Sequence, residues 1–403
     1  MADARDPIRW SRIVLVLLLL FGAMEGVCRV GIQRWLGRPF ASFDAYAFSG
    51  YGVYRQNPRY THPEFVHNSV GFRNEQEFAI EKPPGTFRVM AIGASVLYSG
   101  SASTHLGTSP RVRTSETITA YLEPHLRQMQ ELAGFEIEVI NASVNRQDIR
   151  ETIPYYIAEL SRYDPDVVLV FGTHNDTAYL DYRGAARTLF YDRERPTAEE
   201  ARLELLANAS TFRALAEKAL RVAVDRSALA AVVYRGIDRA LLFVNLQRTG
   251  GRLEARYGDL EPASAEEIEE TLQVYLAALD ALVSYIHVRG AEPAVFWEYM
   301  LLQLEGVKPF SPYERNLVEW LKRSGAGFSE AELRWKLEIR DRVEEHLSRR
   351  GVPLIDIIDE LGEYPETIFN DYLHYNGQGN RIVAEWIAKD LRPVIARAVA
   401  ARR

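Results

Sequence analysis

The chain has 403 residues, 47% of them hydrophobic and 26% charged, which is enough for one large domain with insertions or for two domains. Its formal net charge of -7 argues against a nucleic-acid-binding protein, because phosphate binding needs a basic surface. The single cysteine, Cys28, excludes an intramolecular disulfide and a cysteine-based zinc site.

The first predicted element is an apolar helix. Residues 13–24 form an unbroken apolar run, and its extension through Val30 gives the roughly 20 residues that a membrane-spanning helix needs. Glu25 and Arg29 then lie near its outer end, four residues apart, where they can pair on one helix face. We expect residues 1–36 to be an N-terminal signal anchor or transmembrane helix. A cleaved signal peptide and a buried core helix are the alternatives.

The orientation of such an anchor is hard to predict, because arginines lie on both sides of the apolar run and the positive-inside rule hardly decides. We expect a short N-terminal tail, a single pass through the membrane, and a large exported domain that is periplasmic or extracellular. The membrane is thus an expected partner through this helix.

Residues 37–86 are rich in Gly, Pro, Tyr, Asn and His without a clear period, and we expect an irregular lead-in. From residue 87 to residue 403, short apolar runs alternate with segments of helical periodicity. Strands are predicted at 88–92, 136–141, 166–171, 293–297 and 352–357. Helices are predicted at 115–132, at 148–162, in a segment ending at His287, and at 379–398.

This alternation predicts an α/β domain with a five-stranded parallel sheet. Continuous apolar runs such as residues 166–171 are typical of strands buried on both faces. Two helical insertions, at about 183–262 and 303–349, interrupt the alternation.

Small and polar residues follow the predicted strands. In open parallel sheets, ligands bind at the carboxyl ends of the strands, so these residues are candidates for one site. They lie in four blocks, Gly93-Ala94-Ser95, Asn145-Arg146, Gly172-Thr173-His174-Asn175 and Asp371-Tyr372-Leu373-His374.

The residue types fit acyl transfer. A serine hydroxyl needs a base within hydrogen-bond reach, and His374 can serve Ser95 in that role. Asp371, three residues earlier and on one helical turn, can orient the imidazole. The backbone N–H of Ser95, a backbone N–H near Arg146 and the Asn175 amide could stabilise the oxyanion.

These blocks resemble those of the SGNH (GDSL-like) hydrolase superfamily, over about residues 86–180 and 350–390. The segment from Asn68 to Arg73 resembles the lead-in of its membrane-anchored bacterial members. The resemblance implies a flavodoxin-like three-layer sandwich. It also implies Ser95 as nucleophile, Asn175 in the oxyanion hole, and Asp371 with His374 on one late loop.

Two positions depart from the pattern of this superfamily. Ala94 stands where an aspartate usually precedes the nucleophile, and Arg146 stands where a glycine usually supplies its N–H to the oxyanion hole. Both changes raise the chance of a specialised or weakened enzyme. The arginine keeps its backbone N–H, and its side chain could meet an anionic substrate.

Three further residues are predicted to line the site: Gly93, where backbones approach closely, Asn145, and His174 at the pocket wall. The histidines do not cluster in sequence as metal ligands would, so we expect no metal and no other cofactor.

Three functions are consistent with these residues. The first is a serine esterase that removes acyl groups, in the first place acetyl, from a glycan or envelope-associated substrate or a small ester. The second is an O-acyltransferase acting on an exported polysaccharide with the same triad, served by a membrane acyl-transfer partner. The third is a non-catalytic binding or assembly protein on a decayed SGNH scaffold.

Overall fold

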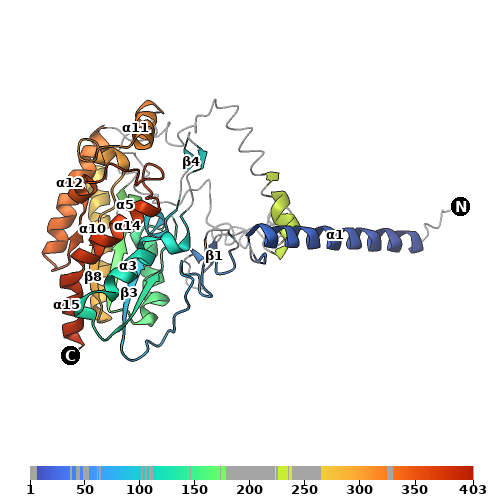
Figure 1. The fold of residues 1–403 in the computed structure, drawn as a ribbon, viewed down its shortest axis with the longest axis horizontal. Helices are drawn as coiled ribbons and strands as arrows, with labels where there is room; N and C mark the ends of the chain where they lie inside the picture. Colours follow the sequence, from blue (N-terminus) through green and yellow to red (C-terminus); the bar gives the residue numbers. More distant parts are fainter. Residues whose placement is uncertain are drawn as a thin grey trace.

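The computed structural model describes residues 7–36, 39–41, 46–48, 54–60, 62, 65–100, 103–104, 107–108, 112–145, 147–172, 174–177, 223, 226–234, 236–237, 265–324 and 330–402. They form a layered α/β body from which one long helix, α1, projects (Figure 1).

Helix α1 spans Pro7–Leu36. Its segment Ser11–Trp35 is long and apolar enough to cross a membrane, since 25 residues rise about 37 Å and the hydrocarbon core is about 30 Å thick. None of its most apolar window is buried in the protein, so the alternative of a buried core helix is wrong. A membrane anchor and a signal sequence both have these properties.

The lead-in begins with a small antiparallel pair, β1 (Tyr46–Phe48) and β2 (Tyr54–Gln56). Among the described residues between β2 and the first strand of the main sheet there is no further helix or strand.

The main sheet has five strands, all parallel: β3 (Thr86–Ile92), β6 (Glu136–Asn141), β7 (Val167–Phe171), β8 (Glu292–Phe296) and β9 (Leu354–Ile355). They lie in the order β6-β3-β7-β8-β9. This is the flavodoxin-like order, and the predicted fold class is confirmed. Every residue of β3 and β7 is buried, and burial on both faces explains why β7 is a continuous apolar run.

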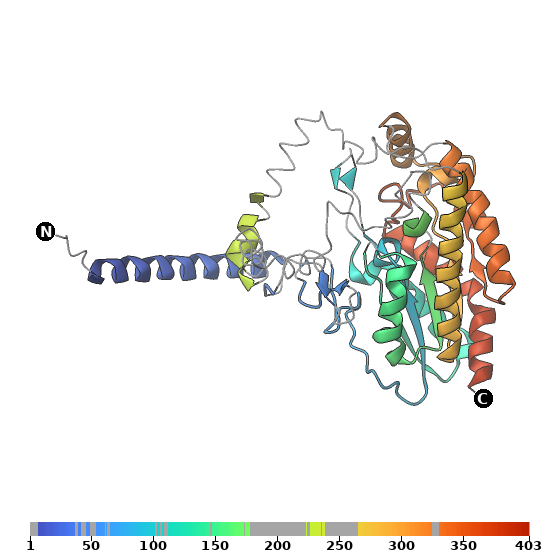
Figure 2. The ribbon, with the colours of Figure 1, turned by 180° about the vertical axis from the view of Figure 1, so that it is seen from behind.

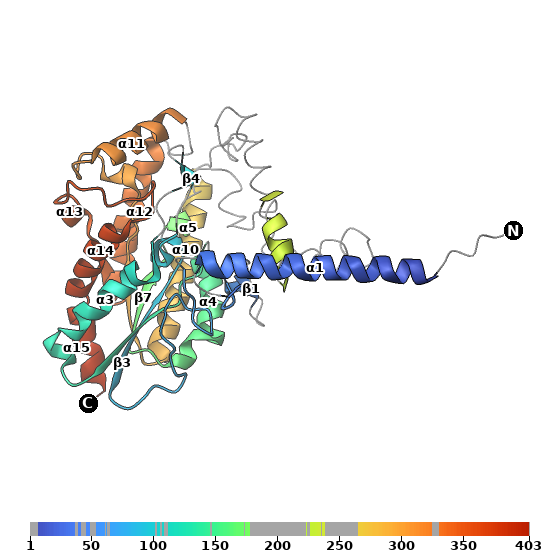
Figure 3. The ribbon, with the colours of Figure 1, turned by 45° about the vertical axis from the view of Figure 1, so that its right-hand side comes forward.

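Helices cover both faces of the sheet (Figures 2 and 3). One face carries α3 (Ile118–Arg127), α14 (Gly377–Asp390) and α15 (Arg392–Ala401). The other carries α4 (Ile149–Ala158) and α10 (Ala265–Val288). The expected three-layer sandwich is therefore present, with its apolar core between the layers.

The remaining elements are short or peripheral. They are α2 (Ser95–Tyr98), β4 (Ser103–Thr104), β5 (Gly107–Thr108), α5 (His174–Thr177), α11 (Pro312–Ser324), α12 (Glu330–Ser348), α13 (Ile358–Leu361), and the 3-10 turns η1 (Thr114–Glu116), η2 (Gln130–Leu132), η3 (Leu160–Tyr163) and η4 (Leu301–Leu304). The second predicted insertion contains α11 and α12, whereas most of the first lies outside the described residues.

Four predicted elements differ from the structure. The helix expected at 115–132 is η1, α3 and η2, and the helix expected at 148–162 is α4 followed by η3. The final helix expected at 379–398 is two helices, because α14 ends at Asp390 and α15 begins at Arg392 with Pro393 in its first turn. Proline has no N–H to continue a helix from the preceding turn but is tolerated at a helix start. The last strand, expected over 352–357, is reduced to two paired residues.

Candidate active site

The site lies where the strand order reverses, at the carboxyl ends of β3 and β7. Gly93 follows β3 with φ of +150°, and a Cβ there would lie 2.1 Å from the Phe171 carbonyl oxygen at the end of β7. The Gly93 carbonyl accepts the Val144 N–H at 2.8 Å, which draws in the loop after β6. Only glycine fits this junction, which brings the first three sequence blocks together.

Ser95 is the first residue of α2 and is partly exposed. The N-cap of α2 is Ala94, with no side-chain cap, so Ser95 is not used as a helix cap. The turn is closed instead by backbone bonds, from Tyr98 N–H to the Ala94 carbonyl at 3.0 Å and from Gly100 N–H to the Ser95 carbonyl at 2.8 Å. Within the described part of the chain, the Ser95 hydroxyl makes no hydrogen bond, so it is available for chemistry.

His374 and Asp371 form an oriented pair. The imidazole Nδ1 lies 2.9 Å from each carboxylate oxygen of Asp371, which has no exposed surface. Because a carboxylate is an acceptor, this contact places the imidazole proton on Nδ1 and leaves a lone pair on Nε2. Nε2 is buried and has no hydrogen-bond partner among the described residues. His374 is thus set up to accept a proton.

The sequence had suggested that this pair lies on one helical turn, but in the structure it does not. Residues 370–373 form a bend, closed by an antiparallel bridge between Phe369 and Tyr375. One Asp371 carboxylate oxygen accepts the N–H groups of Leu373 and His374 at 2.9 and 2.8 Å. Such local bonds from an aspartate compete with helix formation and still hold the two side chains together.

Asn175 lies in α5, directly after β7, and is buried. Its amide nitrogen donates to the Gln147 carbonyl at 2.8 Å, which fixes it against the loop after β6. A side-chain amide has two N–H donors, so a second one remains for an oxyanion. Arg146, the other predicted donor in this loop, lies outside the described residues.

Two contacts join the late loop and the helix that follows it, α14, to the first and third blocks. The His174 ring lies 6.5 Å, centre to centre, from the ring of Tyr372, which follows Asp371. The Asn380 amide of α14 donates at 2.9 Å to the hydroxyl of Ser99, which lies four residues after Ser95. The described residues of the four blocks therefore lie at one edge of the sheet. The structure does not, however, bring Ser95 and His374 into hydrogen-bond contact.

The other two predicted lining residues also lie at this edge. A Cβ added at Gly100 would lie 3.4 Å from Asn145 Oδ1 and 3.3 Å from Ser95 Cβ, so Asn145 is close to the nucleophile turn. His174 is buried, and its backbone N–H donates to Glu298 at 2.9 Å.

A group of buried acids in and around α5 was not predicted. Asp176, Asp148 and Glu298 are each less than 5% exposed. Asp176 accepts the Ile149 N–H at the start of α4 at 3.1 and 3.2 Å. Burial raises the pKa of Asp176 well above its usual value, and the nearby charge of Asp148 raises it further. The sequence places these acids after three different strands, so only their position at strand ends hinted at this group.

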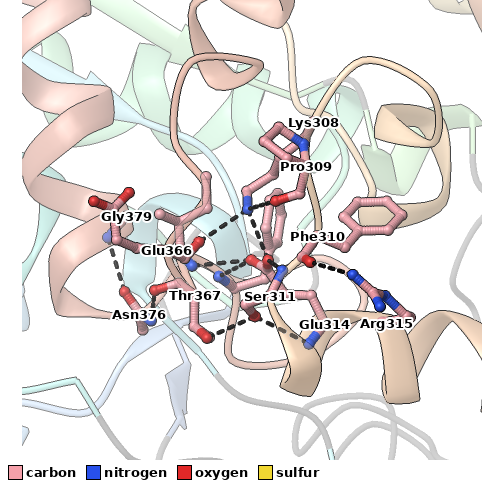
Figure 4. A network of polar contacts seen from close by, with 12 residues as sticks. Lys308, Pro309, Phe310, Ser311, Glu314, Arg315, Glu366, Thr367, Asn376 and Gly379 are labelled. Carbon is pink, nitrogen blue, oxygen red and sulfur yellow. Dashed lines mark hydrogen bonds and ion pairs between the residues drawn. The ribbon is translucent and has the colours of Figure 1, made fainter.

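The late loop is held by a second buried network, shown in Figure 4. The Glu314 carboxylate accepts the N–H groups of Ile368 and Phe369 at 2.9 and 3.3 Å. It also pairs with Lys308 at 2.7 Å, and neither side chain is exposed. The Tyr313 hydroxyl donates to the Asn370 carbonyl at 2.5 Å. The segment directly before Asp371 is thus fixed by the second insertion.

The lead-in supports the nucleophile helix from the other side. Arg73 is buried between the rings of Phe65 and Tyr98, 4.1 and 4.3 Å from their centres. The Tyr98 hydroxyl, on α2, also contacts His67 Nε2 at 2.9 Å. Sequence reasoning noted the segment from Asn68 to Arg73 but did not predict that it packs on the helix of Ser95.

Among the described residues, no three His, Cys, Asp or Glu side chains gather as metal ligands would. No family model matches the chain, and no curated protein matches it.

Solved structures do resemble it. An acetylxylan esterase, Axe2, from Geobacillus stearothermophilus is 14% identical with a TM-score of 0.39, over 77% of this chain and 95% of that one. A protein described as lipolytic and of the G-D-S-L family, from Desulfitobacterium hafniense DCB-2, is 11% identical with a TM-score of 0.35, over 75% of this chain and 99% of that one. At these values the likeness carries no function over, and the chemistry has to be judged from the residues of this chain.

Proposed function

We propose that the chain is a serine esterase of SGNH type that hydrolyses acyl esters, in the first place acetyl esters, on a glycan or envelope-associated substrate. The observation that carries the proposal is the state of His374. Its Nδ1 is held by Asp371 while its Nε2 is buried without a partner among the described residues, at the edge that also carries Ser95. A histidine held in this way can act as a general base, because Nε2 is left to accept a proton from the nucleophile.

The proposed reaction follows from these groups. His374 Nε2 takes the proton of the Ser95 hydroxyl as its oxygen attacks the acyl carbonyl carbon. The developing oxyanion accepts hydrogen bonds from the Ser95 N–H and the Asn175 amide, with the Arg146 N–H as an expected third donor. The protonated His374 then gives its proton to the leaving alcohol oxygen. Water, activated by the same histidine, attacks the acyl-enzyme, releases the carboxylic acid and restores Ser95.

This scheme requires Ser95 and His374 to come within hydrogen-bond distance once substrate is bound. Catalytic hydrogen bonds are often long in the free enzyme and tighten in the complex. Ser95 is partly exposed and begins a single helical turn, so a change in its rotamer on substrate binding would not disturb a helix cap.

Turnover of activated acetyl esters, followed by a panel of acetylated glycans, tests the proposal. We expect turnover by the wild type and at least a thousandfold less by Ser95→Ala, in line with triad enzymes. Equal rates for the two proteins on every ester would contradict a nucleophilic role for Ser95, and no turnover by either protein, with or without a polysaccharide acceptor, would leave only the binding-protein alternative.

An O-acyltransferase would share every step up to the acyl-enzyme and differ in what attacks it. The apolar helix α1 favours this candidate as well, since it would hold the site near a membrane-embedded acyl donor. Product analysis with and without a polysaccharide acceptor separates the two. Acyl transfer to the acceptor at the expense of hydrolysis indicates a transferase, whereas hydrolysis unaffected by any acceptor indicates an esterase.

The proposal includes a location. We expect α1 to remain as a single-pass anchor, with the α/β domain exported. A C-terminal alkaline phosphatase fusion, which is active only outside the cytoplasm, reports the side of the domain, and the mass of the mature protein reports cleavage. Inactive fusions would contradict export.

A further inference from the structure

A second helix with apolar residues on its surface lies across the apolar helix α1. Residues 228–234 are helical, as are residues 236–237, and we call these two stretches together the crossing helix. In Figures 1, 2 and 3 it runs across α1 rather than along it, near the end of α1 that faces the α/β body.

A polar tie fixes the start of the crossing helix to α1. The Glu25 carboxylate accepts the N–H groups of Ala228 and Leu229 at 3.0 and 2.9 Å and the hydroxyl of Ser227 at 2.8 Å. Arg29 pairs with the same carboxylate at 2.7 Å. Its guanidinium also donates to the Arg226 carbonyl at 2.8 Å. Glu25 therefore caps the crossing helix, and its charge is met by a helix N-terminus and by an arginine.

This tie removes an obstacle to placing α1 in a bilayer. Glu25 is the sole acidic residue in the segment Ser11–Trp35. A carboxylate in an apolar medium is costly unless it is paired and hydrogen-bonded, and here both conditions are met.

The two faces of the crossing helix differ. Ala228 and Ala231 have no exposed surface and pack with Ile32 and Cys28 of α1. Small residues at such a contact allow two helices to approach closely. The rest of its surface carries Val232, Val233, Tyr234 and Ile237, which are between 43% and 55% exposed. A run of large apolar residues this exposed needs an apolar partner.

The arrangement identifies that partner as lipid. Residues 8–24 of α1 lie on the N-terminal side of the contact at Glu25, and they rise about 25 Å, close to the roughly 30 Å of the hydrocarbon core. A helix that crosses a spanning helix at this level lies in the plane of the membrane interface. Valine, isoleucine and tyrosine side chains suit that depth.

We propose that the crossing helix lies in the membrane interface and inserts Val232, Val233, Tyr234 and Ile237 among the lipids. The protein then contacts the bilayer through two segments locked together by Glu25. Two contacts restrict the rotation of the α/β domain about α1 and set its height above the membrane. The inference rests on the anchor proposed above, but not on the chemistry of Ser95.

Depth-dependent fluorescence quenching tests this in the full-length protein, reconstituted in vesicles of phosphatidylethanolamine and phosphatidylglycerol. In a Cys28→Ala background, a single cysteine is placed by Val233→Cys and carries a nitrobenzoxadiazole label. Leu18→Cys, exposed on α1, is the control for the membrane interior, and Val288→Cys, exposed at the end of α10, is the control for water. The quenchers are nitroxide lipids labelled near the headgroup or deep in the chain, and aqueous iodide.

We expect the Val233 label to be quenched several-fold more by shallow nitroxide lipid than the Val288 label is, and to be protected from iodide. Quenching of the Val233 label by iodide alone, or by neither agent, would overturn the proposal, since the first indicates water and the second a protein partner or a second copy. If the Leu18 label also escaped the deep nitroxide, the anchor itself would be wrong. Activity toward esters is independent of all these outcomes.

The role of the tie can be tested in the same way. With Glu25→Ala, we expect the shallow quenching of the Val233 label to fall toward the level of the Val288 label while that of the Leu18 label is unchanged. Unchanged quenching at Val233 would show that Glu25 does not place the crossing helix.

Discussion

Lys308 and Glu314 form an ion pair with an N···O distance of 2.7 Å, and neither side chain has any exposed surface. The Glu314 carboxylate also takes the N–H groups of Ile368 and Phe369, three and two residues before Asp371. A buried charge pair alone is weak evidence for stability. Here the pair supports the loop that carries the proposed base, so its effect is expected in catalysis as well as in stability.

Glu314→Gln should therefore lower both the catalytic activity and the stability of the protein. An unpaired buried Lys308 is expected to cost about 3–5 kcal/mol of unfolding free energy. In the protein that remains folded, we expect kcat to fall about 10–100-fold with KM for a small ester nearly unchanged, because a displaced base affects the chemical step rather than binding.

The measurements are urea unfolding and steady-state kinetics at a temperature where the variant is folded. Lys322→Met is the matched control, because the Lys322–Glu305 pair lies on the same insertion but is about half exposed. A folded Glu314→Gln variant with wild-type kcat would show that the network has no role in positioning the base.

Asp371→Asn should preserve the shape of the late loop, because an amide oxygen can still accept the Leu373 and His374 N–H groups. It removes the charge that stabilises the imidazolium, and it offers an N–H to Nδ1, which favours the wrong tautomer. We expect kcat/KM for an activated ester to fall about 10³–10⁴-fold with little change in melting temperature. A loss below tenfold would argue that Asp371 does not orient the base.

Asn175→Ala should remove one oxyanion donor. The expected loss in kcat is about 10²–10³-fold, the usual effect of deleting such a donor, with KM nearly unchanged. The amide also donates to the Gln147 carbonyl, so a small loss of stability is expected in addition. If kcat were unchanged while stability fell, Asn175 would be only a support for the loop after β6.

Asp176 should make folding dependent on pH. Its pKa is raised well above its usual value, first by burial and then by Asp148. An acid whose pKa is raised by folding contributes stability at low pH, where it is protonated, and this contribution is lost as pH rises through the folded-state pKa. Asp176→Asn cannot ionise and can still accept the Ile149 N–H.

We therefore expect the Asn variant to gain stability relative to the wild type between pH 5 and pH 8, by about 1–3 kcal/mol. Urea unfolding in detergent at several pH values measures this difference. Asp359→Asn, at an exposed position of α13, is the control. A difference between Asp176→Asn and wild type that stays constant with pH would contradict the assignment.

The sheet could be predicted because its strands are local apolar runs. Residues 136–141 and 166–171 fall on β6 and β7 almost residue for residue. The strand-end residues Gly93, Ser95 and Asn175 could be placed at one edge for the same reason, since parallel strands share their carboxyl ends.

What could not be predicted depends on contacts between distant parts of the chain. Glu314 meets Ile368 across 54 residues, and Glu25 meets Ala228 across 203. Neither glutamate differs in its sequence surroundings from a solvated one. The bend at Asp371 was missed for another reason: three-residue spacing fits a helical turn and an aspartate-closed bend equally well.

The central claim is that Ser95 is a nucleophile activated by His374, and labelling with a fluorophosphonate probe tests it most directly. Mass spectrometry of the peptide that contains position 95 measures the extent of labelling in wild type, Ser95→Ala and His374→Ala. We expect one probe per chain on Ser95 in the wild type, none in Ser95→Ala, and labelling slowed at least a hundredfold in His374→Ala. Absence of labelling at Ser95, or equal labelling rates in wild type and His374→Ala, would contradict the account.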